Sequence, residues 1–399
     1  MKKFVYKARE TATDKIVKST VQAESESAAG KLLIERGLAP ISLHEDQGGL
    51  LQKINGRIPV KDKIVFTRQL ATLIGAGLPL TQSLHTVLDQ TQNKAFKAII
   101  EDIVTTVESG KSLGESFGKH PDVFNKVYLS LVAAGEVSGT LDDSLKRIAA
   151  QQEKDAAMMS KIKGALTYPI IVVFVIFGVM AFMLFTVVPQ VEKLYEDMGE
   201  QLPFLTQIMV GAANFLLGFW WLVLIMVVGL VLGLRQYLKT ESGIKFSDTF
   251  KLNVPLFGGL FKRLYMARFT RTAQTLLATG VAMLDTLHIS GEATSNTIVQ
   301  QSIENAAEKV KAGKPLSVAI KDQDYILPLV PQMAGIGEQS GKIDEMLGKA
   351  AQVYEDELDE MIRTISTMIE PILMVLLAVM AGGMIGAILF PIYGLVNSV

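Results

Sequence analysis

The chain contains one short phrase twice: GEVSGTLDDSL at Gly135–Leu145 and GEQSGKIDEML at Gly337–Leu347. The two copies lie 202 residues apart, and an apolar run follows each of them. A phrase repeated in an equivalent setting indicates that a larger unit has been duplicated.

The duplication extends upstream of the phrase. FTRQLATLIGAGLPLTQSLH at 66–85 aligns with FTRTAQTLLATGVAMLDTLH at 269–288, and GKSL at 110–113 matches GKPL at 313–316. Within both copies, apolar residues recur at spacings of three and four, which is typical of amphipathic helices. We therefore expect two homologous antiparallel helical bundles, at 61–165 and 235–368.

Three segments lack charged side chains in their apolar cores over lengths that can cross a bilayer, and we predict membrane spans at 168–189, 208–234 and 370–396, with Glu370 at the boundary of the third. Pro169 is followed by Pro189, and Pro371 by Pro391, each pair 20 residues apart. At about 1.5 Å per residue this separation is ~30 Å, which matches the hydrocarbon core. Each repeat unit thus ends in its own span, with a helix bend expected at Pro169 and Pro371.

The charges that flank the spans predict their orientation. Lysines and arginines border the bundles, whereas the connection at 190–207 is acidic. Because basic residues stay in the cytoplasm, both bundles and the N-terminus are expected there, and the C-terminus outside. The N-terminus MKKFVYKARE lacks the apolar stretch of a signal peptide.

Composition agrees with a mixed protein that has water-facing domains and a few spans. Hydrophobic residues make up 49% of the 399 residues, and the mean hydropathy is +0.32. The net charge of −1 does not favour nucleic-acid binding, and the absence of cysteine excludes disulfides and thiolate metal sites.

The first residues follow another pattern. FVYKARE and KIVKSTVQA have the composition of strands, and SESAAGKLLIERG that of a capped helix. We expect a small α+β module at 1–46 and a linker at 47–60. The fold class is thus mainly α, a polytopic membrane protein with two bundles, three spans and this module.

Two motifs suggest chemistry that their surroundings do not support. GESFG at 114–118 fits a hydrolase nucleophile elbow, but it lies in a helical context, and the second copy has Ala319 where Ser116 stands. ESGKSL lacks the first glycine of a phosphate-binding loop. The spans carry no ionisable side chain that would mark a transport path. We expect no catalytic site, no metal site and no cofactor, although a divalent ion held by acidic residues of one bundle stays open.

The third span carries small residues at four-residue intervals, Ala378, Gly382 and Gly386, and the second carries Gly229 and Gly233. Such faces allow close helix packing. Packing within the chain and packing against another subunit or another protein's helix are both open interpretations.

The ordered set of motifs resembles the type II secretion F-domain family, the polytopic platform proteins of type IV pilus and type II secretion machines. Two copies of FTR…L…G…L and GE-x-SG-x-[LI]-D carry the resemblance, together with KGALTYPIIV, VVPQVEKLYEDMGEQLPFLT and EPILMVLLAVMAGGMIGAILFPIYGL. It covers essentially the whole chain.

This resemblance implies a cytoplasmic-membrane platform, not an enzyme, that couples a hexameric assembly ATPase to the insertion or extraction of pilin subunits. Implied partners are the ATPase, pilins or pseudopilins, other inner-membrane components, the lipid bilayer and further copies of the chain. A type IV pilus machine is favoured. The alternatives are a type II secretion pseudopilus and, from another class, a membrane-tethered receptor or adaptor with duplicated domains.

The repeated phrase is expected to form the turn that starts each long exit helix, with Thr140 capping the first of them through a T-x-x-D box. Its two glutamates invite two hypotheses: a pair with an arginine of the opening helix, or a role in docking the ATPase. The residues concerned are Gly135, Glu136, Gly139 and Arg68 in the first copy and Gly337, Glu338, Gly341 and Arg271 in the second.

Overall fold

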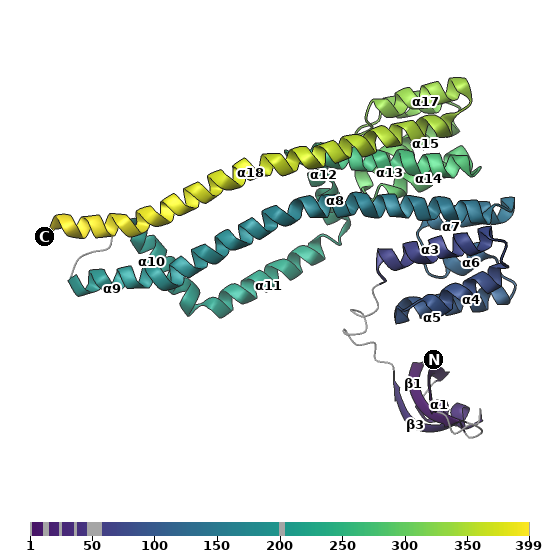
Figure 1. Ribbon diagram of the computed structural model, residues 1–399, viewed down its shortest axis with the longest axis horizontal. Coiled ribbons are helices and arrows are strands. Elements are labelled where there is room, and N and C mark those ends of the chain that lie inside the picture. Colours follow the sequence, from purple (N-terminus) through teal and green to yellow (C-terminus); the bar gives the residue numbers. More distant parts are fainter. Residues whose placement is uncertain are drawn as a thin grey trace. The chain divides into compact units, whose positions relative to one another are not determined.

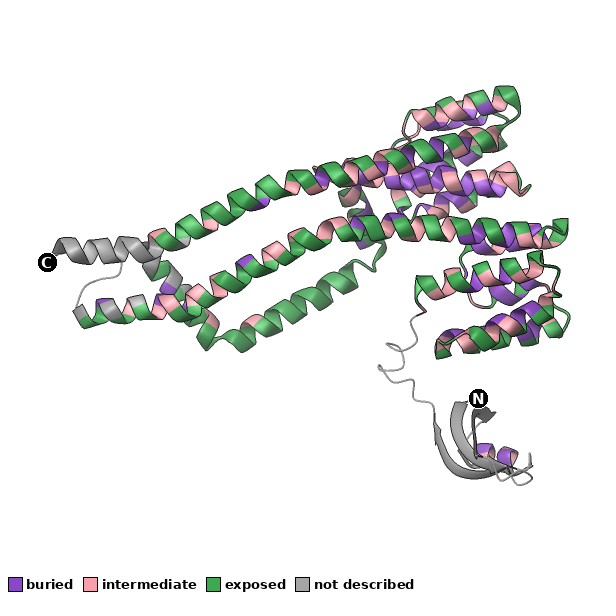
Figure 2. Cartoon of the chain, in the orientation of Figure 1, coloured by how far each residue is buried: buried purple, intermediate pink, exposed green. Residues whose placement is uncertain are grey.

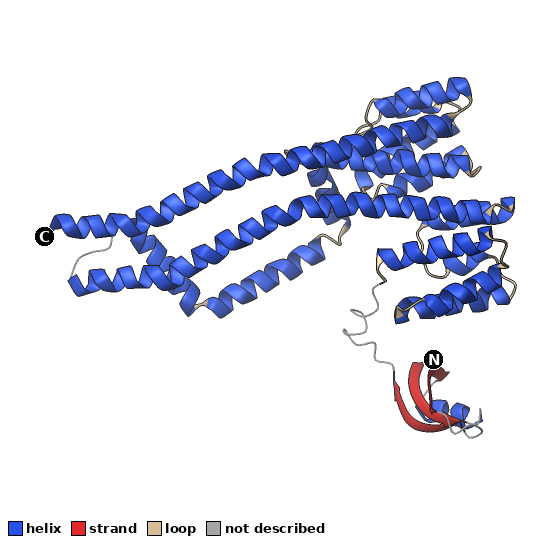
Figure 3. Cartoon of the chain, viewed as in Figure 1, coloured by secondary structure: helices blue, strands red, loops and turns tan. Residues whose placement is uncertain are grey.

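The computed structural model describes residues 2–10, 16–23, 26–35, 38–45, 58–198 and 204–398. By internal contacts the chain forms two units, one of residues 1–59 and 91–101, the other of residues 60–90 and 102–399. Most of the expected linker at 47–60 lies outside the described residues. Figure 3 shows helices throughout the described chain, with strands only near the N-terminus.

The N-terminal residues form a three-stranded antiparallel sheet in the order β2-β1-β3. Its strands are β1 (Lys2–Glu10), β2 (Ile16–Ala23) and β3 (Leu38–Glu45), and the helix α1 (Glu26–Glu35) connects β2 to β3. In the backbone register, Phe4 of β1 pairs with Val21 of β2 on one side and with Glu45 of β3 on the other. Among the described side chains of α1, Ala29 and Leu33 are fully buried.

The first bundle consists of α3 (Val60–Gly75), α4 (Leu80–Gln90), α5 (Lys94–Glu108), α6 (Leu113–Gly118), α7 (Lys126–Ser138) and the start of α8 (Leu141–Phe182). An aromatic cluster fills its core. Phe117 packs edge-on against Phe66 and Tyr128, and Phe124 lies 4.5 Å from Phe117 between ring centroids. Such ring pairs stabilise a core beyond the area they bury.

The second bundle repeats the same helix order. Its helices are α13 (Gly258–Ala278), α14 (Met283–Ala293), α15 (Thr297–Lys311), α16 (Leu316–Lys321), α17 (Leu329–Ser340) and the start of α18 (Ile343–Ser398). Aliphatic residues replace most of the aromatic core: Phe66 corresponds to buried Phe269, but Phe117 corresponds to Ile320. Glycines with positive φ recur at equivalent positions of both bundles, at 77, 110 and 139 and at 280, 313 and 341. The predicted pair of homologous bundles is confirmed.

The helix that leaves each bundle continues directly into an apolar segment. From Leu141 the chain stays helical through α8, a π-helical turn η1 (Met183–Val187) and α9 (Val188–Met198). Figure 2 shows α8 and α18 changing from partly buried, beside the bundles, to largely exposed farther along. Within the described residues, three helices are long and apolar enough to cross a membrane, in the ranges 141–197, 220–237 and 343–383.

The prolines do not bound these helices. Pro169 lies inside α8, and Pro371 and Pro391 lie inside α18. Pro189 follows η1, where the wider π-helical turn relieves the clash between the proline ring and the carbonyl of Phe185, four residues earlier. The spans are therefore parts of much longer helices.

The second apolar segment is not one helix. It is split into α10 (Phe204–Gly218) and α11 (Trp220–Tyr237), with a break at Phe219. Of the two, α11 is the helix long enough to cross a bilayer. A short helix α12 (Glu241–Asn253) then leads from α11 into the second bundle (Figure 1). The predicted span at 208–234 thus combined two helices, because hydropathy does not record the break.

Candidate functional site

The repeated phrase forms the tight turn between the last two helices of each bundle. Gly139, which ends α7, and Gly341, which ends α17, adopt the left-handed conformation with φ of 73° and 69°. Their N–H groups donate to the carbonyls of Gly135 and Gly337. An L-residue is strained in this conformation, so glycine is required at the turn.

The first glycine of each phrase allows the two helices to cross at close range. A Cβ atom on Gly135 would lie 2.4 Å from the Oγ and 2.7 Å from the Cβ of Ser144 on α8. A Cβ atom on Gly337 would lie 2.6 Å from the Cα of Ile343 on α18. The exit helices therefore begin in direct backbone contact with the preceding helices.

The glutamate of each phrase caps the short helix of its bundle. The carboxylate of Glu136 accepts hydrogen bonds from the backbone N–H groups of Leu113 and Gly114, at 2.9 and 3.2 Å. Glu338 accepts from the N–H of Leu316 and from the N–H and hydroxyl of Ser317, the latter at 2.5 Å. Negative charge is favoured at these free N–H groups. The glutamates thus tie the last turns of α7 and α17 to α6 and α16.

The predicted pairing of these glutamates with the opening-helix arginines is wrong, because all four residues have other partners. Arg68 forms a bidentate ion pair with Glu153 on α8. Arg271 donates to Glu355 on α18 at 2.8 Å. The repeat itself could have identified Glu153 and Glu355, since they occupy equivalent positions 202 residues apart.

Thr140 also differs from its expected role. Its side chain makes no capping bond to α8 and lies 2.7 Å from the Ser138 hydroxyl instead. The backbone N–H of Thr140 donates to the carbonyl of Gly135 at 2.9 Å. In the second copy, the N–H of Lys342 donates to the carbonyl of Gly337 at the same distance. The turn closes through the backbone, so the identity of this residue is free to differ between the copies.

Polar contacts join the two exit helices. Lys154 of α8 lies 3.1 Å from Glu355 of α18, the carboxylate that also binds Arg271. Further along, Lys161 pairs with Asp359 at 2.5 Å. Exposed ion pairs contribute about 0–1 kcal/mol each, but Glu355 is only 13% exposed and holds two cations.

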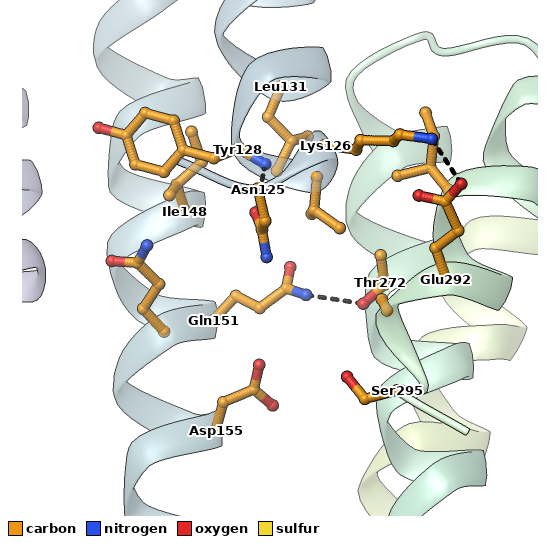
Figure 4. A pocket seen from close by; sticks show the side chains of 14 residues that line it. Asn125, Lys126, Tyr128, Leu131, Ile148, Gln151, Asp155, Thr272, Glu292 and Ser295 are labelled. Carbon is orange, nitrogen blue, oxygen red and sulfur yellow. Dashed lines mark hydrogen bonds and ion pairs between the residues drawn. The ribbon is translucent and has the colours of Figure 1, made fainter. Parts of the chain in front are cut away.

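A cavity of about 220 Å³ lies between the bundles beside these contacts (Figure 4). Gln151 reaches across it to donate to Thr272 at 2.7 Å, and Lys126 pairs with Glu292. Asp155 lines the same cavity. Burial raises the pKa of the Asp155 carboxyl, while the nearby Arg268 guanidinium opposes that shift.

Several buried polar atoms around this contact have no hydrogen-bond partner in the described part of the chain. They are Gln151 Oε1, Gln152 Oε1, Arg268 Nε and Arg271 Nη2. Unsatisfied groups of this kind weaken an interface. This part of the contact between the bundles is polar and incompletely bonded. Farther along, Met158 and Ile162 of α8 are buried in an apolar cluster with residues of the second bundle, namely Leu260, Leu264, Leu358 and Ile365.

Ser116, of the rejected hydrolase motif, is fully buried and donates to the carbonyl of Ser112. Among the described residues, no cluster of three or more histidine, aspartate or glutamate side chains is arranged to hold a metal ion.

The small-residue faces of the spans point away from the rest of the chain. A Cβ atom on Gly382, Gly229 or Gly233 would meet nothing within 4 Å. Ala378 is exposed as well, and Gly386 is partly buried. Among the described residues, Gly229, Gly233 and Gly382 therefore have no neighbouring side chain or helix against them, and packing of these faces against another molecule stays a prediction.

Comparison with known proteins gives a consistent result. The family profile "Type II secretion system (T2SS), protein F" matches residues 66–189 and 269–391, one match for each repeat unit. The Thermus thermophilus type IV pilus assembly protein PilC is 35% identical over 99% of this chain and 98% of its own length. The Myxococcus xanthus protein of the same name is 36% identical over 99% and 95%. The type II secretion system protein F of Xanthomonas campestris is 33% identical over 99% of both chains.

Proposed function

This chain belongs to the type II secretion system protein F family, and from that premise we propose that it is the cytoplasmic-membrane platform of a type IV pilus assembly machine. The family and its relatives' names support an inner-membrane protein with a platform role. Relatives named for type IV pilus assembly reach 36% identity, compared with 33% for those named for type II secretion, which favours the pilus.

We further propose the topology expected from the charges. The module at 1–46 and the bundles at 61–165 and 235–368 would lie in the cytoplasm, joined by the linker at 47–60. The spans would cross at 168–189, within 208–234 and at 370–396, with the connection at 190–207 and the C-terminus outside. The connection at 190–207 has a single basic residue, Lys193, whereas Arg235 and Lys239 follow the second span, and this difference supports the orientation.

The observation that carries the mechanism is helical continuity. The helix that closes the first bundle stays helical from Leu141 to Met198, and α18 runs from Ile343 to Ser398. A helix transmits displacement along its axis because its backbone bonds are satisfied internally. We propose that a hexameric assembly ATPase moves the bundles and that the exit helices carry this motion into the bilayer, where pilin subunits are inserted or extracted.

The polar part of the contact between the bundles, around Gln151 and Asp155, suits such motion. Polar, incompletely bonded contacts between domains allow relative movement more readily than large apolar ones. The bundle cores and the caps at Glu136 and Glu338 would keep each bundle rigid while the contact between them changes. In this proposal the chain itself catalyses no reaction, holds no cofactor, and works as a homo-oligomer with other inner-membrane components.

The coupling can be tested at Gly164, an exposed helical residue of α8 at the end of the first bundle and four residues before the first span, where an added Cβ atom would meet nothing. Gly164→Pro removes a backbone hydrogen bond and kinks the helix, at a cost of about 3 kcal/mol. In a strain lacking the native gene, we expect this variant to reach the membrane at normal levels and to assemble no pili. Gly164→Ala is the matched control and should assemble pili normally. Normal piliation by Gly164→Pro would contradict the coupling mechanism.

The same strain separates the alternatives. Loss of surface pili on deletion supports the pilus machine, whereas loss of an exported enzyme with intact pili supports a type II secretion platform. A receptor or adaptor would leave both processes intact. Single-cysteine crosslinking from the third span and from the α7–α8 turn should capture pilin and the ATPase respectively.

A further inference from the structure

The helix α12 connects the span α11 to the second bundle and has two different faces. Asp248 and Leu252 are buried, at 5% and 1% exposure. Asp248 accepts hydrogen bonds from the N–H and hydroxyl of Thr297, at 2.8 and 2.9 Å, and so binds the start of α15. This face fixes α12 to the bundle.

The opposite face presents two aromatic rings that contact no buried core. Phe246 and Phe250 are 60% and 61% exposed, and their rings stack with centroids 6.1 Å apart. Each is two residues from Asp248, which places it about 200° around the helix from the anchored face. The aromatic face therefore points away from the bundle.

The corner between α11 and α12 is rigid and short. Thr240 caps α12 by accepting from the N–H of Gly243 at 3.1 Å, and its hydroxyl donates to the carbonyl of Tyr237 at 2.7 Å. A Cβ atom on Gly243 would lie 2.0 Å from that carbonyl. The chain thus turns within three residues of the end of α11, and the hydrogen bonds of Thr240 hold the start of α12 directly against that end.

The residues that follow α12 fix its position relative to the third span. Leu256 and Phe257 pack into the same apolar cluster as Ile365 and Ile369 of α18. Ile369 lies two residues before Pro371, where the third span is expected to begin. In Figure 1, α12 runs across the direction of α8 and α18 at the level where they leave the bundles. The end of α11 and the part of α18 just before Pro371, both next to expected membrane spans, thus lie close to α12 and the residues that follow it.

The basic residues around α12 also favour a position at the membrane surface. Arg235, Lys239 and Lys245 surround this corner, Lys251 pairs with Asp248, and the other acidic residue is Glu241 in the first turn of α12. Basic residues next to exposed aromatic rings are typical of helices that lie in the headgroup region of anionic membranes.

We propose that α12 is an in-plane membrane anchor, whose Phe246 and Phe250 rings insert into the cytoplasmic leaflet while its basic residues contact lipid phosphates. The occupant of this face is the phospholipid bilayer. The anchor holds the near end of the second bundle at a fixed depth, so that movement of the bundle would be a tilt about α12. The inference depends on the membrane spans and not on the proposed pilus function.

The chain has no native cysteine, so a single introduced cysteine can be labelled without background. A spin label at Thr249→Cys, exposed beside the two rings, would be studied in the full chain reconstituted into vesicles of phosphatidylcholine and phosphatidylglycerol. Collision with a water-soluble nickel complex measures its exposure to water. Val375→Cys, in the third span, gives the lipid reference, and Val137→Cys, which is 91% exposed at the α7–α8 turn, gives the aqueous reference.

We expect the nickel collision rate at Thr249→Cys to be at least about threefold below that at Val137→Cys, as for a helix at the headgroup boundary. Adding Phe246→Ser and Phe250→Ser should raise it toward the aqueous reference. Val318→Ser, an exposed apolar residue of α16, is the matched control and should not change it.

Equal collision rates at Thr249→Cys and Val137→Cys would overturn the proposal, as would protection that the serine substitutions leave unchanged. A spin–spin distance showing that two labels face each other across a dimer would assign the face to a second copy of the chain instead of lipid. Size-exclusion profiles like that of the parent chain confirm that each variant is folded.

Discussion

Replacement of Gly135 by alanine tests whether the repeated turn is a close crossing of helices. The added Cβ atom would lie 2.7 Å from the Ser144 Cβ atom and 3.2 Å from the Leu141 Cα atom. Carbon atoms in favourable contact are about 3.5–4.0 Å apart, so α7 and α8 would have to separate by several tenths of an ångström or more.

The expected cost follows from two opposing effects. Overpacking of a well-packed contact costs about 1–3 kcal/mol, and alanine in place of glycine inside a helix recovers up to about 1 kcal/mol. A net loss of roughly 1–2 kcal/mol corresponds to a fall of about 4–16 °C in the unfolding midpoint of a bundle near a hundred residues. Gly337→Ala should cost more, because its Cβ atom would meet the backbone of Ile343, which no rotamer change can move.

Thermal unfolding of the detergent-solubilised full chain, followed by circular dichroism, provides the measurement. Gly164→Ala is the control, since its Cβ atom would meet nothing within 4 Å, and it should be neutral or slightly stabilising. Ser144→Gly combined with Gly135→Ala should recover part of the loss by removing the clashing atoms. If Gly135→Ala unfolds at the same temperature as Gly164→Ala, the close crossing is refuted.

Three further predictions concern the Glu338 cap and the polar contacts between the two bundles. Glu338→Ala leaves backbone N–H groups of α16 without an acceptor and should cost about 1–2 kcal/mol of unfolding free energy, whereas Glu338→Gln should cost less, measured by the same thermal assay. Because burial raises the pKa of the Asp155 carboxyl above its unfolded value, the contribution of Asp155 to stability should be fully present below the unfolded pKa and should be lost as the pH rises through the raised value. Asp155→Asn should flatten this dependence in thermal unfolding across mildly acidic to neutral buffers, and an unchanged slope would exclude Asp155 as its source. Lys161→Asp should weaken the contact of the exit helices and reduce piliation, and adding Asp359→Lys should restore it; failure of the double variant to improve on the single one would show that the pair is not used.

The duplication and the membrane character could be predicted from the sequence because both depend on patterns along the chain. The phrase at Gly135 and its copy at Gly337 identified two units, and charge-free runs identified where three membrane helices lie. Helical periodicity reports which residues face a core without reference to their partners.

The partners of the polar residues could not be predicted in the same way. Glu136 and Arg68 belong to one bundle, and a direct pair between them was the simplest hypothesis. The structure instead directs Glu136 to the N–H groups of α6 and Arg68 to Glu153, because the antiparallel packing of α3 against α8 sets which charges approach each other. Arg68 and Glu153 are 85 residues apart in the chain, and a contact between such distant side chains leaves no signal in the spacing of neighbouring residues.

Patterns along the chain were enough to identify the parts of this protein: two homologous helical bundles, apolar helices that continue from them, and glycines at the turns. How those parts meet became known from the tertiary fold. It places the break at Phe219, continues α8 through Pro169, and presents Phe246 and Phe250 away from the second bundle. The physical reason is that hydropathy and periodicity are properties of single segments, whereas caps, ion pairs and helix breaks depend on groups that folding brings together from distant positions.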